Sequence, residues 1–246
     1  MNNIEHVGKY FIMLRHVFTK PQRGRVFREA VFREIDELGH KSLGIVAFIS
    51  FFIGGVIALQ TALNLESPFI PKSLIGFAAK RSVILEFAPT FCSIILAGKV
   101  GSYITSSIGA MRVTEQIDAL EVMGINSLNY LVLPKIIATV CFYPFLIILG
   151  MFLGIFGGWI AGNLSGLFSG VDFIVGVQMD FDPFLIAYAL IKTVVFAFLI
   201  ATVPSYHGYY VKGGSLEVGK ASTQSVVWTT VLIVIANYFL TQMLLT

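Results

Sequence analysis

Two charged side chains, Glu86 and Lys192, stand well inside long apolar stretches of the sequence. An ionised group at the centre of a bilayer costs roughly 2.5 to 3.5 kcal/mol on insertion scales unless it is paired or hydrated. Lys192 lies about 14 Å along a helix from Pro183, so its side chain cannot easily reach the membrane surface. Two interpretations are open: an ion pair that only fixes helix packing, or a polar lining beside a cavity that receives charged headgroups or water.

The segment from Gly214 to Ala221 resembles the phosphate-binding loop G-x-x-x-x-G-K-[ST] and misses it by one residue. Ala221 has no hydroxyl for Mg²⁺, no buried parallel strand precedes the segment, and an apolar stretch follows it. We therefore expect no nucleotide site, and any ATP that drives this protein must be hydrolysed by another chain.

No other set of residues has the spacing of an enzyme or metal site. Cys92 and Cys141 both fall in apolar stretches without a C-x-x-C pattern, so we expect two small buried hydrophobic residues and no disulfide. A Ser-His-Asp set and a carboxylate pair are also missing. The four histidines have no ligand-like spacing: His6, His16, His40 and His207.

The amino-acid composition indicates the kind of structure that must position these candidate residues. The chain has 246 residues, of which 56% are hydrophobic and 13% are charged, whereas about a quarter of a soluble domain is charged. These values indicate a membrane protein and exclude intrinsic disorder and a large soluble domain. A formal net charge of +3 is too small to indicate nucleic acid as a partner.

Five stretches are long and apolar enough to cross a bilayer as helices, which takes roughly 20 residues each. The sequence therefore predicts an all-α polytopic membrane protein, because the alternation of a membrane β-barrel is absent. We expect the segment 163–182 to be an outer loop, since the third stretch is longer than one crossing needs. The predicted spans are 42–65, 82–111, 136–162, 183–208 and 221–246.

Lysine and arginine are distributed unevenly between the two sides that these spans define. Thirteen lie on the side of the N-terminus and three on the other side, with Lys192 inside a span. The positive-inside rule then places the N-terminus in the cytoplasm.

The first 41 residues have a separate pattern, which predicts amphipathic helices in the inner membrane interface. Pro21 and Gly24 should end the first helix. Attraction of this basic arm to anionic lipid and a specific partner contact are both open. Its apolar stripe comprises Val7, Tyr10, Phe11, Leu14, Val17 and Phe18, and a second stripe comprises Phe27, Val31, Ile35 and Leu38.

A short cytoplasmic helix over residues 113–124 is predicted between the second and third spans. Thr114 can cap it, Glu115 suits its first turn, and Gly124 can end it. Glu115, Asp118 and Glu121 form an acidic strip. This helix is either a solvated loop helix or an element that transmits force from a cytoplasmic partner.

Four glycines of the third span are spaced four residues apart, so a neighbouring backbone can approach this ridge closely. The neighbour is either another helix of the same subunit or a second copy in a homodimer. The glycine ridge consists of Gly150, Gly154, Gly158 and Gly162.

Several of these segments together resemble the MlaE/YrbE family of permeases. The most specific is MRVTEQIDAL at residues 111–120. The likeness covers nearly everything from about residue 45 onward. The matching segments are 52–60, 86–89, 98–102, 109–124, 133–135, 191–196 and 219–227.

The resemblance implies a homodimeric permease of an ABC transporter in the bacterial inner membrane. Such a permease moves phospholipid between that membrane and a periplasmic ring of MCE-domain protein. It has no cofactor of its own, because ATP and Mg²⁺ bind to a cytoplasmic ABC ATPase, which sometimes has a small STAS-domain subunit beside it.

Site residues follow from the same resemblance. Glu86 and Lys192 fall on positions near the lipid pathway, and Ile57 and Leu65 would line the lipid pocket. The ATPase would dock on the coupling helix, whose residues include Arg112, Glu115, Gln116, Asp118, Leu120 and Glu121.

The chain also departs from the family pattern. Some relatives have an arginine where Leu85 stands and an aspartate where Asn237 stands, so the pocket of this chain carries less charge. Lys99 and Lys135 replace arginines, and Ser106-Ser107 replaces Ala-Glu. Two alternatives are an ion- or proton-coupled transporter that uses Glu86 as a titrating carboxylate, and a structural membrane anchor for a periplasmic assembly.

Overall fold

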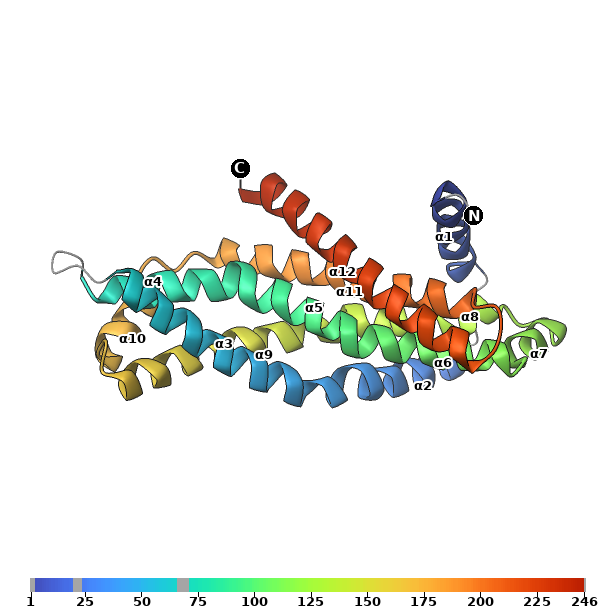
Figure 1. Cartoon of the computed structure of the whole chain (residues 1–246), viewed down its shortest axis with the longest axis horizontal. Coiled ribbons are helices and arrows are strands. Elements are labelled where there is room, and N and C mark those ends of the chain that lie inside the picture. The colour runs from blue at the N-terminus through green and yellow to red at the C-terminus, as the bar shows by residue number, and fades with distance from the viewer. Residues whose placement is uncertain (1–2, 20–23, 66–70, 246) are drawn as a thin grey trace. The chain divides into compact units, whose positions relative to one another are not determined.

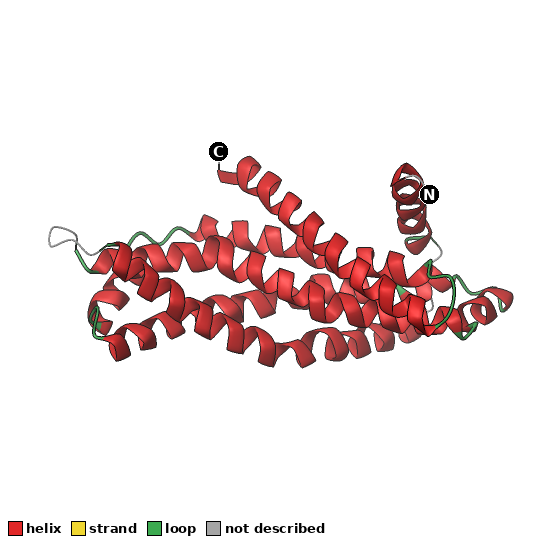
Figure 2. Cartoon of the chain, viewed as in Figure 1, coloured by secondary structure: helices red, strands yellow, loops and turns green. Residues whose placement is uncertain are grey.

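The computed structural model describes residues 3–19, 24–65 and 71–245, and these contain helices, turns and loops but no strand (Figures 1 and 2). The predicted all-α class is therefore confirmed. In chain order the elements are α1 (Asn3–Val17), α2 (Gly24–Glu34), the π-helical η1 (Ile35–Gly39), the 3₁₀ turn η2 (His40–Ser42), α3 (Leu43–Asn64), α4 (Ser73–Ser82), the π-helical η3 (Val83–Phe91), α5 (Cys92–Leu96), the π-helical η4 (Ala97–Gly101), α6 (Ser102–Val113), α7 (Gln116–Val122), α8 (Ser127–Leu131), α9 (Leu133–Ser165), α10 (Gly170–Gln178), α11 (Pro183–Tyr209) and α12 (Ser215–Leu245).

Five continuous helical stretches of the described chain are long and apolar enough to cross a membrane. The second begins at Ser73 instead of residue 82, and the fifth begins at Ser215 instead of residue 221. The five stretches are Gly24–Asn64, Ser73–Val113, Ser127–Ser165, Pro183–Tyr209 and Ser215–Leu244.

Lys80 explains why the second stretch begins earlier than the sequence predicts. Its side chain is 3% exposed, and its ammonium donates hydrogen bonds to the carbonyl oxygens of Met179, at 2.6 Å, and Asp180, at 3.4 Å. Two backbone carbonyls thus replace water around a charge that, on sequence alone, marks the end of an apolar segment. The helix continues through this charge.

The predicted outer loop contains a helix, α10. Ser169 is its N-cap, with Oγ accepting a hydrogen bond from the Val171 amide at 3.2 Å. A Cβ on Gly176 would overlap the Ser73 carbonyl oxygen, and one on Gly76 would overlap the Phe173 carbonyl oxygen. The backbones of α10 and α4 therefore pack closely. The glycine and serine content of this segment predicted a loop and did not indicate this packing.

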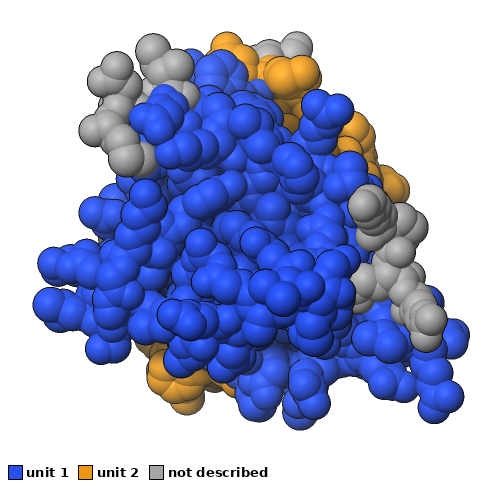
Figure 3. Space-filling model, turned by 90° about the vertical axis from the view of Figure 1, so that its right-hand side faces the viewer, with its two compact units in different colours: residues 1–41, 94–142, 195–239 blue, residues 42–93, 143–194, 240–246 orange. Residues whose placement is uncertain are grey.

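The chain divides into two compact units, coloured blue and orange in Figure 3. Unit 1 comprises residues 1–41, 94–142 and 195–239, and unit 2 comprises residues 42–93, 143–194 and 240–246. The core of unit 2 is built from α3, α4 and the α9–α10 region. Its buried residues are Ile57, Ala58, Ala62, Ile75, Ala79, Val83, Phe168 and Phe173.

Unit 1 joins α6, α11 and α12 through small and polar contacts. The Thr105 hydroxyl is hydrogen-bonded to the Pro204 carbonyl oxygen at 3.0 Å and to Ser225 Oγ at 2.8 Å. A Cβ on Gly109 would lie 2.9 Å from Val218. Hydroxyl contacts of this kind are common between membrane helices, where no hydrophobic force drives association.

The helix α1 shows that only part of the predicted N-terminal stripe faces the protein. Val17 is buried, whereas Val7, Phe11 and Phe18 are exposed. The hydroxyl of Tyr10 is hydrogen-bonded to Thr202 at 2.7 Å, and burial raises its pKa, so it remains protonated at neutral pH. The exposed apolar side chains suit contact with lipid. Pro21, the predicted helix breaker, lies outside the described residues.

Cys92 is buried as predicted, with Sγ 3.4 Å from Ser50 Oγ. Cys141 is exposed, so the expectation that it is buried was wrong. An apolar membrane span has an outward face as well as a packed one, and apolarity alone does not tell the two apart.

Candidate functional site

Glu86 and Lys192 meet in unit 2. Glu86 lies in η3 and Lys192 in α11, with the ammonium nitrogen 2.7 Å from Oε1. The lysine side chain is 0% exposed and the glutamate side chain is 38% exposed. The two charged residues therefore differ in access: the glutamate side chain is open to a ligand, whereas the lysine side chain is fully covered.

Three further oxygen atoms surround the Lys192 ammonium. Nζ lies 2.9 Å from the Tyr188 hydroxyl, 3.3 Å from Thr241 Oγ1 and 3.2 Å from the Leu85 carbonyl oxygen. Pro89 has no N–H to donate, so the ordinary α-helical partner of that carbonyl is missing. The charge is thus solvated by the protein itself.

Both oxygen atoms of the Glu86 carboxylate also accept hydrogen bonds from hydroxyl groups. Thr90 donates to Oε2 at 3.0 Å, and Thr241 donates to Oε1 at 3.3 Å. The carboxylate is therefore held in one orientation while part of it stays accessible.

The three hydroxyl residues of this network were not predicted from the sequence. Thr90 stands four residues after Glu86 and Tyr188 four residues before Lys192, so the helical i, i+4 spacing contained a signal for both. Thr241 comes from α12 and has no such relation in sequence to either charge.

Ile57 and Leu65 do not line the pocket that unit 2 contains. They pack in its core with Ala62 and Phe168. The pocket is small, about 10 Å³, which is room for roughly one water-sized sphere. It is lined by Ser50, Ile53, Gly54, Val83, Phe87, Ala88, Cys92, Gly150 and Gly154. The end of α3 packs against α4 and Phe168 in this core, and the role of Ile57 and Leu65 in a lipid pocket stays a prediction.

The glycine ridge packs against other helices of its own chain. A Cβ on Gly150 would lie 2.9 Å from Ser50 Oγ, and a Cβ on Gly54 of α3 would overlap the Gly154 carbonyl oxygen. The nearest atoms to a Cβ at positions 150, 154, 158 and 162 belong to Ser50, Val83, Phe173 and Phe168, respectively. The ridge therefore brings α3 and α9 together within one subunit.

The segment that resembles a phosphate-binding loop forms no such loop. Because α12 begins at Ser215, Gly219 and Lys220 are helical. Lys220 is paired with Glu217 at 2.7 Å on the same helix. The backbone amides of Gly219 and Lys220 form hydrogen bonds within the helix and cannot surround a phosphate.

The predicted cytoplasmic helix is α7, which is shorter than expected. Thr114 is not its N-cap, because its hydroxyl is hydrogen-bonded to the Ala110 carbonyl oxygen at 2.9 Å. The N-cap is Glu115, whose φ of 58° is rare for a residue with a side chain. Gly124 ends the helix with φ 74°, and the bonds from Gly124 N to Glu121 O and from Ile125 N to Leu120 O form a Schellman motif.

The acidic strip of α7 is largely occupied by contacts within the protein. Asp118 is paired with Arg112 at 2.7 Å, and Glu121 Oε1 accepts a hydrogen bond from the Tyr209 hydroxyl at 2.8 Å. The most exposed side chains at its end are apolar: Val122 is 89% exposed and Met123 is 65% exposed. Gln116 is exposed, Leu120 is half-buried and Ile117 is fully buried.

Comparison with known proteins gives one family. The family described as Permease MlaE matches residues 31–243. A protein of Rickettsia bellii named "Probable ABC transporter permease protein" is 34% identical over 97% of this chain and 92% of its own length. The "Intermembrane phospholipid transport system permease protein MlaE" of Haemophilus influenzae is 30% identical, with coverage of 94% and 88%. The Arabidopsis thaliana "Protein TRIGALACTOSYLDIACYLGLYCEROL 1, chloroplastic" is 28% identical, with coverage of 93% and 65%.

Proposed function

Because the chain belongs to the MlaE permease family, we propose that it is the membrane permease of an ABC transporter that moves phospholipid. The name of the Haemophilus influenzae relative supports phospholipid as the substrate, and the name of the Rickettsia bellii relative supports an ABC transporter. A cytoplasmic ATPase supplies the energy and binds ATP and Mg²⁺. The permease sits in the inner membrane with its N-terminus in the cytoplasm.

The accessible carboxylate of Glu86 is the observation that carries this proposal. A phospholipid that leaves the bilayer needs a polar contact for its headgroup part of the way through the membrane, and Glu86 offers one that Thr90 and Thr241 hold in place. Lys192 is 0% exposed, so it acts by fixing and neutralising Glu86 instead of touching the lipid. Leu85 adds no charge beside them.

The ATPase docks on the exposed end of α7. Val122 and Met123 would enter an apolar groove of the ATPase, while Glu115 and Gln116 lie at the polar margin of the contact. This assignment replaces the acidic strip as the main contact, because Asp118 and Glu121 already have partners within the permease.

A homodimer is part of the same proposal. The glycine ridge is used within the subunit, so the second copy binds elsewhere, and α12 offers a surface. Only 11% of its membrane-spanning window is buried within the chain, against 39–56% for the other four. A periplasmic ring of MCE-domain protein would receive the lipid, and a STAS-domain subunit would accompany the ATPase.

Isolation of the protein from its native membrane tests this assembly. The protein would be purified in mild detergent with its bound subunits, and both the proteins and the lipids would be identified by mass spectrometry. We expect an ABC ATPase, an MCE-domain protein and phospholipid. The absence of both proteins under conditions that preserve the dimer would refute the proposal.

A further inference from the structure

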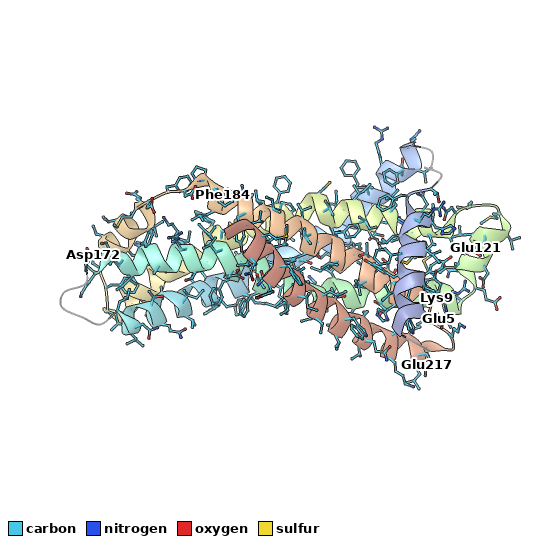
Figure 4. All side chains as sticks on the ribbon, turned by 90° about the horizontal axis from the view of Figure 1, so that it is seen from above. Glu5, Lys9, Glu121, Asp172, Phe184 and Glu217 are labelled. Carbon is cyan, nitrogen blue, oxygen red and sulfur yellow. The ribbon has the colours of Figure 1, made fainter. Side chains whose placement is uncertain are left out.

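The hydroxyl of Tyr209 joins three helices of unit 1. Tyr209 is the last residue of α11, and its hydroxyl donates to Glu121 Oε1 of α7 at 2.8 Å. Ser127, the first residue of α8, lies 2.9 Å from the same hydroxyl and donates to the same Glu121 oxygen at 3.0 Å. Figure 4 labels Glu121 on the segment that carries α7. The three side chains form a closed triangle of hydrogen bonds.

The ring of Tyr209 adds a fourth helix to this junction. The guanidinium of Arg112, near the end of α6, lies 5.9 Å from the ring centroid and also pairs with Asp118 of α7 at 2.7 Å. Such a cation over an aromatic face is attracted to it. The ends of α6, α7, α8 and α11 therefore meet at one tyrosine.

The residue before Tyr209 leaves little room for α11 to slide past α6. A Cβ on Gly208 would lie 2.8 Å from the Thr105 carbonyl oxygen, so the two backbones are in close contact. The Thr105 hydroxyl also donates to the Pro204 carbonyl oxygen at 3.0 Å. Because α11 and α6 are tightly packed here, a movement of Tyr209 displaces α11 as a whole and is not absorbed by a gap between the two helices.

We propose that Tyr209 is the positioning residue through which α7 moves the fourth crossing helix. This inference rests on the proposed function, in which an ATPase displaces α7. In the described part of the chain, the hydrogen bonds from α11 to α7 and α8 all end on the Tyr209 hydroxyl. The helix that it ends, α11, also carries Lys192.

Two single substitutions that each remove one hydroxyl test this role. Tyr209→Phe deletes both hydrogen bonds and keeps the ring under Arg112. Tyr210→Phe is the matched control, because Tyr210 is the next residue, its ring meets that of Tyr209 edge to face, and its hydroxyl makes no hydrogen bond within the described residues. The permease is reconstituted with its ATPase in proteoliposomes, and lipid transfer and ATP hydrolysis are measured together.

We expect Tyr209→Phe to lower the lipid transferred per ATP hydrolysed about ten-fold, the factor that corresponds to one hydrogen bond to a charged group. In Tyr209→Phe, binding of the ATPase and its basal ATP hydrolysis should remain normal. In Tyr210→Phe, the lipid transferred per ATP hydrolysed should also remain normal. A merely structural role would lower binding and both rates together. If the wild type transfers lipid normally and Tyr209→Phe has an unchanged ratio of lipid transferred to ATP hydrolysed, this inference alone is overturned. If the wild type shows no ATP-dependent transfer, the proposed function is overturned as well.

A double-mutant cycle covers the case in which Tyr209→Phe fails to fold. Glu121→Gln weakens the same hydrogen bonds from an exposed side chain, so it leaves the packing of α11 intact. We expect it to lower the same ratio, and we expect Tyr209→Phe to add little in the double variant because both changes remove one interaction. A normal ratio in Glu121→Gln, or fully additive losses, would contradict the proposal.

Discussion

Lys192 in unit 2 and Lys135 in unit 1 each bring a charge into a buried position, and each meets a glutamate there, but the two ion pairs have different surroundings. Lys192 lies 2.7 Å from Glu86 and has three further oxygen acceptors. Lys135 lies 2.5 Å from Glu34 and 5.7 Å from the ring centroid of Tyr103. The carboxylates differ as well: Glu86 is 38% exposed and Glu34 is 17% exposed.

The hydrogen bonds of the two carboxylates differ in a way that distinguishes a candidate binding site, at Glu86, from a structural ion pair, at Glu34. Both oxygen atoms of Glu86 accept hydrogen bonds, whereas Glu34 Oε2 is buried without a hydrogen-bond partner among the described residues. A buried oxygen without a partner costs stability and offers nothing to a ligand. The Glu34–Lys135 pair therefore connects α2 with α9, whereas the Glu86–Lys192 pair leaves its glutamate side chain accessible, as the proposed contact with a lipid headgroup requires.

Removal of Lys192 should have the largest effect on transport. In Lys192→Ala, Glu86 loses its counter-charge inside the membrane and with it the orientation that the network fixes. We expect ATP-driven phospholipid transfer in proteoliposomes to fall more than ten-fold at normal expression.

The double variant Glu86→Gln with Lys192→Met provides the control. It leaves no uncompensated charge in the bilayer, so we expect it to transfer more lipid than either single variant. Normal transfer by Lys192→Ala would contradict the role of the pair and favour a structural anchor.

Removal of Lys135 should affect stability instead. Lys135→Met leaves Glu34 buried and unpaired, which costs about 3 kcal/mol. We expect a lower unfolding temperature in detergent and normal transfer per folded molecule. A variant that folds with normal stability but transfers no lipid would place Lys135 in the transport machinery and remove the distinction between the pairs.

Loss of one hydroxyl from the Glu86 network should have the smallest effect. Thr90→Val removes the hydrogen bond to the charged Glu86 carboxylate, which is worth about 1.5 kcal/mol, so we expect transfer to fall about ten-fold. Thr193→Val is the matched control, because the Thr193 hydroxyl donates to the Ala189 carbonyl oxygen of its own helix at 2.8 Å. Equal transfer by the two variants would show that the orientation of Glu86 is unimportant.

The pattern of apolar residues predicted the helices of this chain better than their ends. Long apolar stretches predicted five membrane helices, because a bilayer leaves few other structures available. The start of the second at Ser73 was missed, since two carbonyl oxygens that solvate Lys80 come from residues about one hundred positions later. Partners so distant in sequence leave no local signal.

The charged residues of the site were predictable from the sequence, whereas a hydroxyl residue contributed by a distant helix was not. The cost of charge in a membrane singled out Glu86 and Lys192, and the structure brings them together. The position of Thr241 beside them depends on how α12 packs, which no spacing reveals. The turn at Gly124 was predicted from its residue type, whereas the left-handed conformation of Glu115 was not, because glutamate has no preference for it.

ATP-driven transfer of a labelled phospholipid by the wild-type permease, reconstituted with its ATPase, tests the central claim most directly. We predict that transfer requires ATP hydrolysis and continues unchanged when a proton ionophore removes any pH gradient across the vesicle membrane. Transfer that proceeds without ATP and stops when the gradient is removed would contradict the account and would make Glu86 the titrating carboxylate of a proton-coupled transporter.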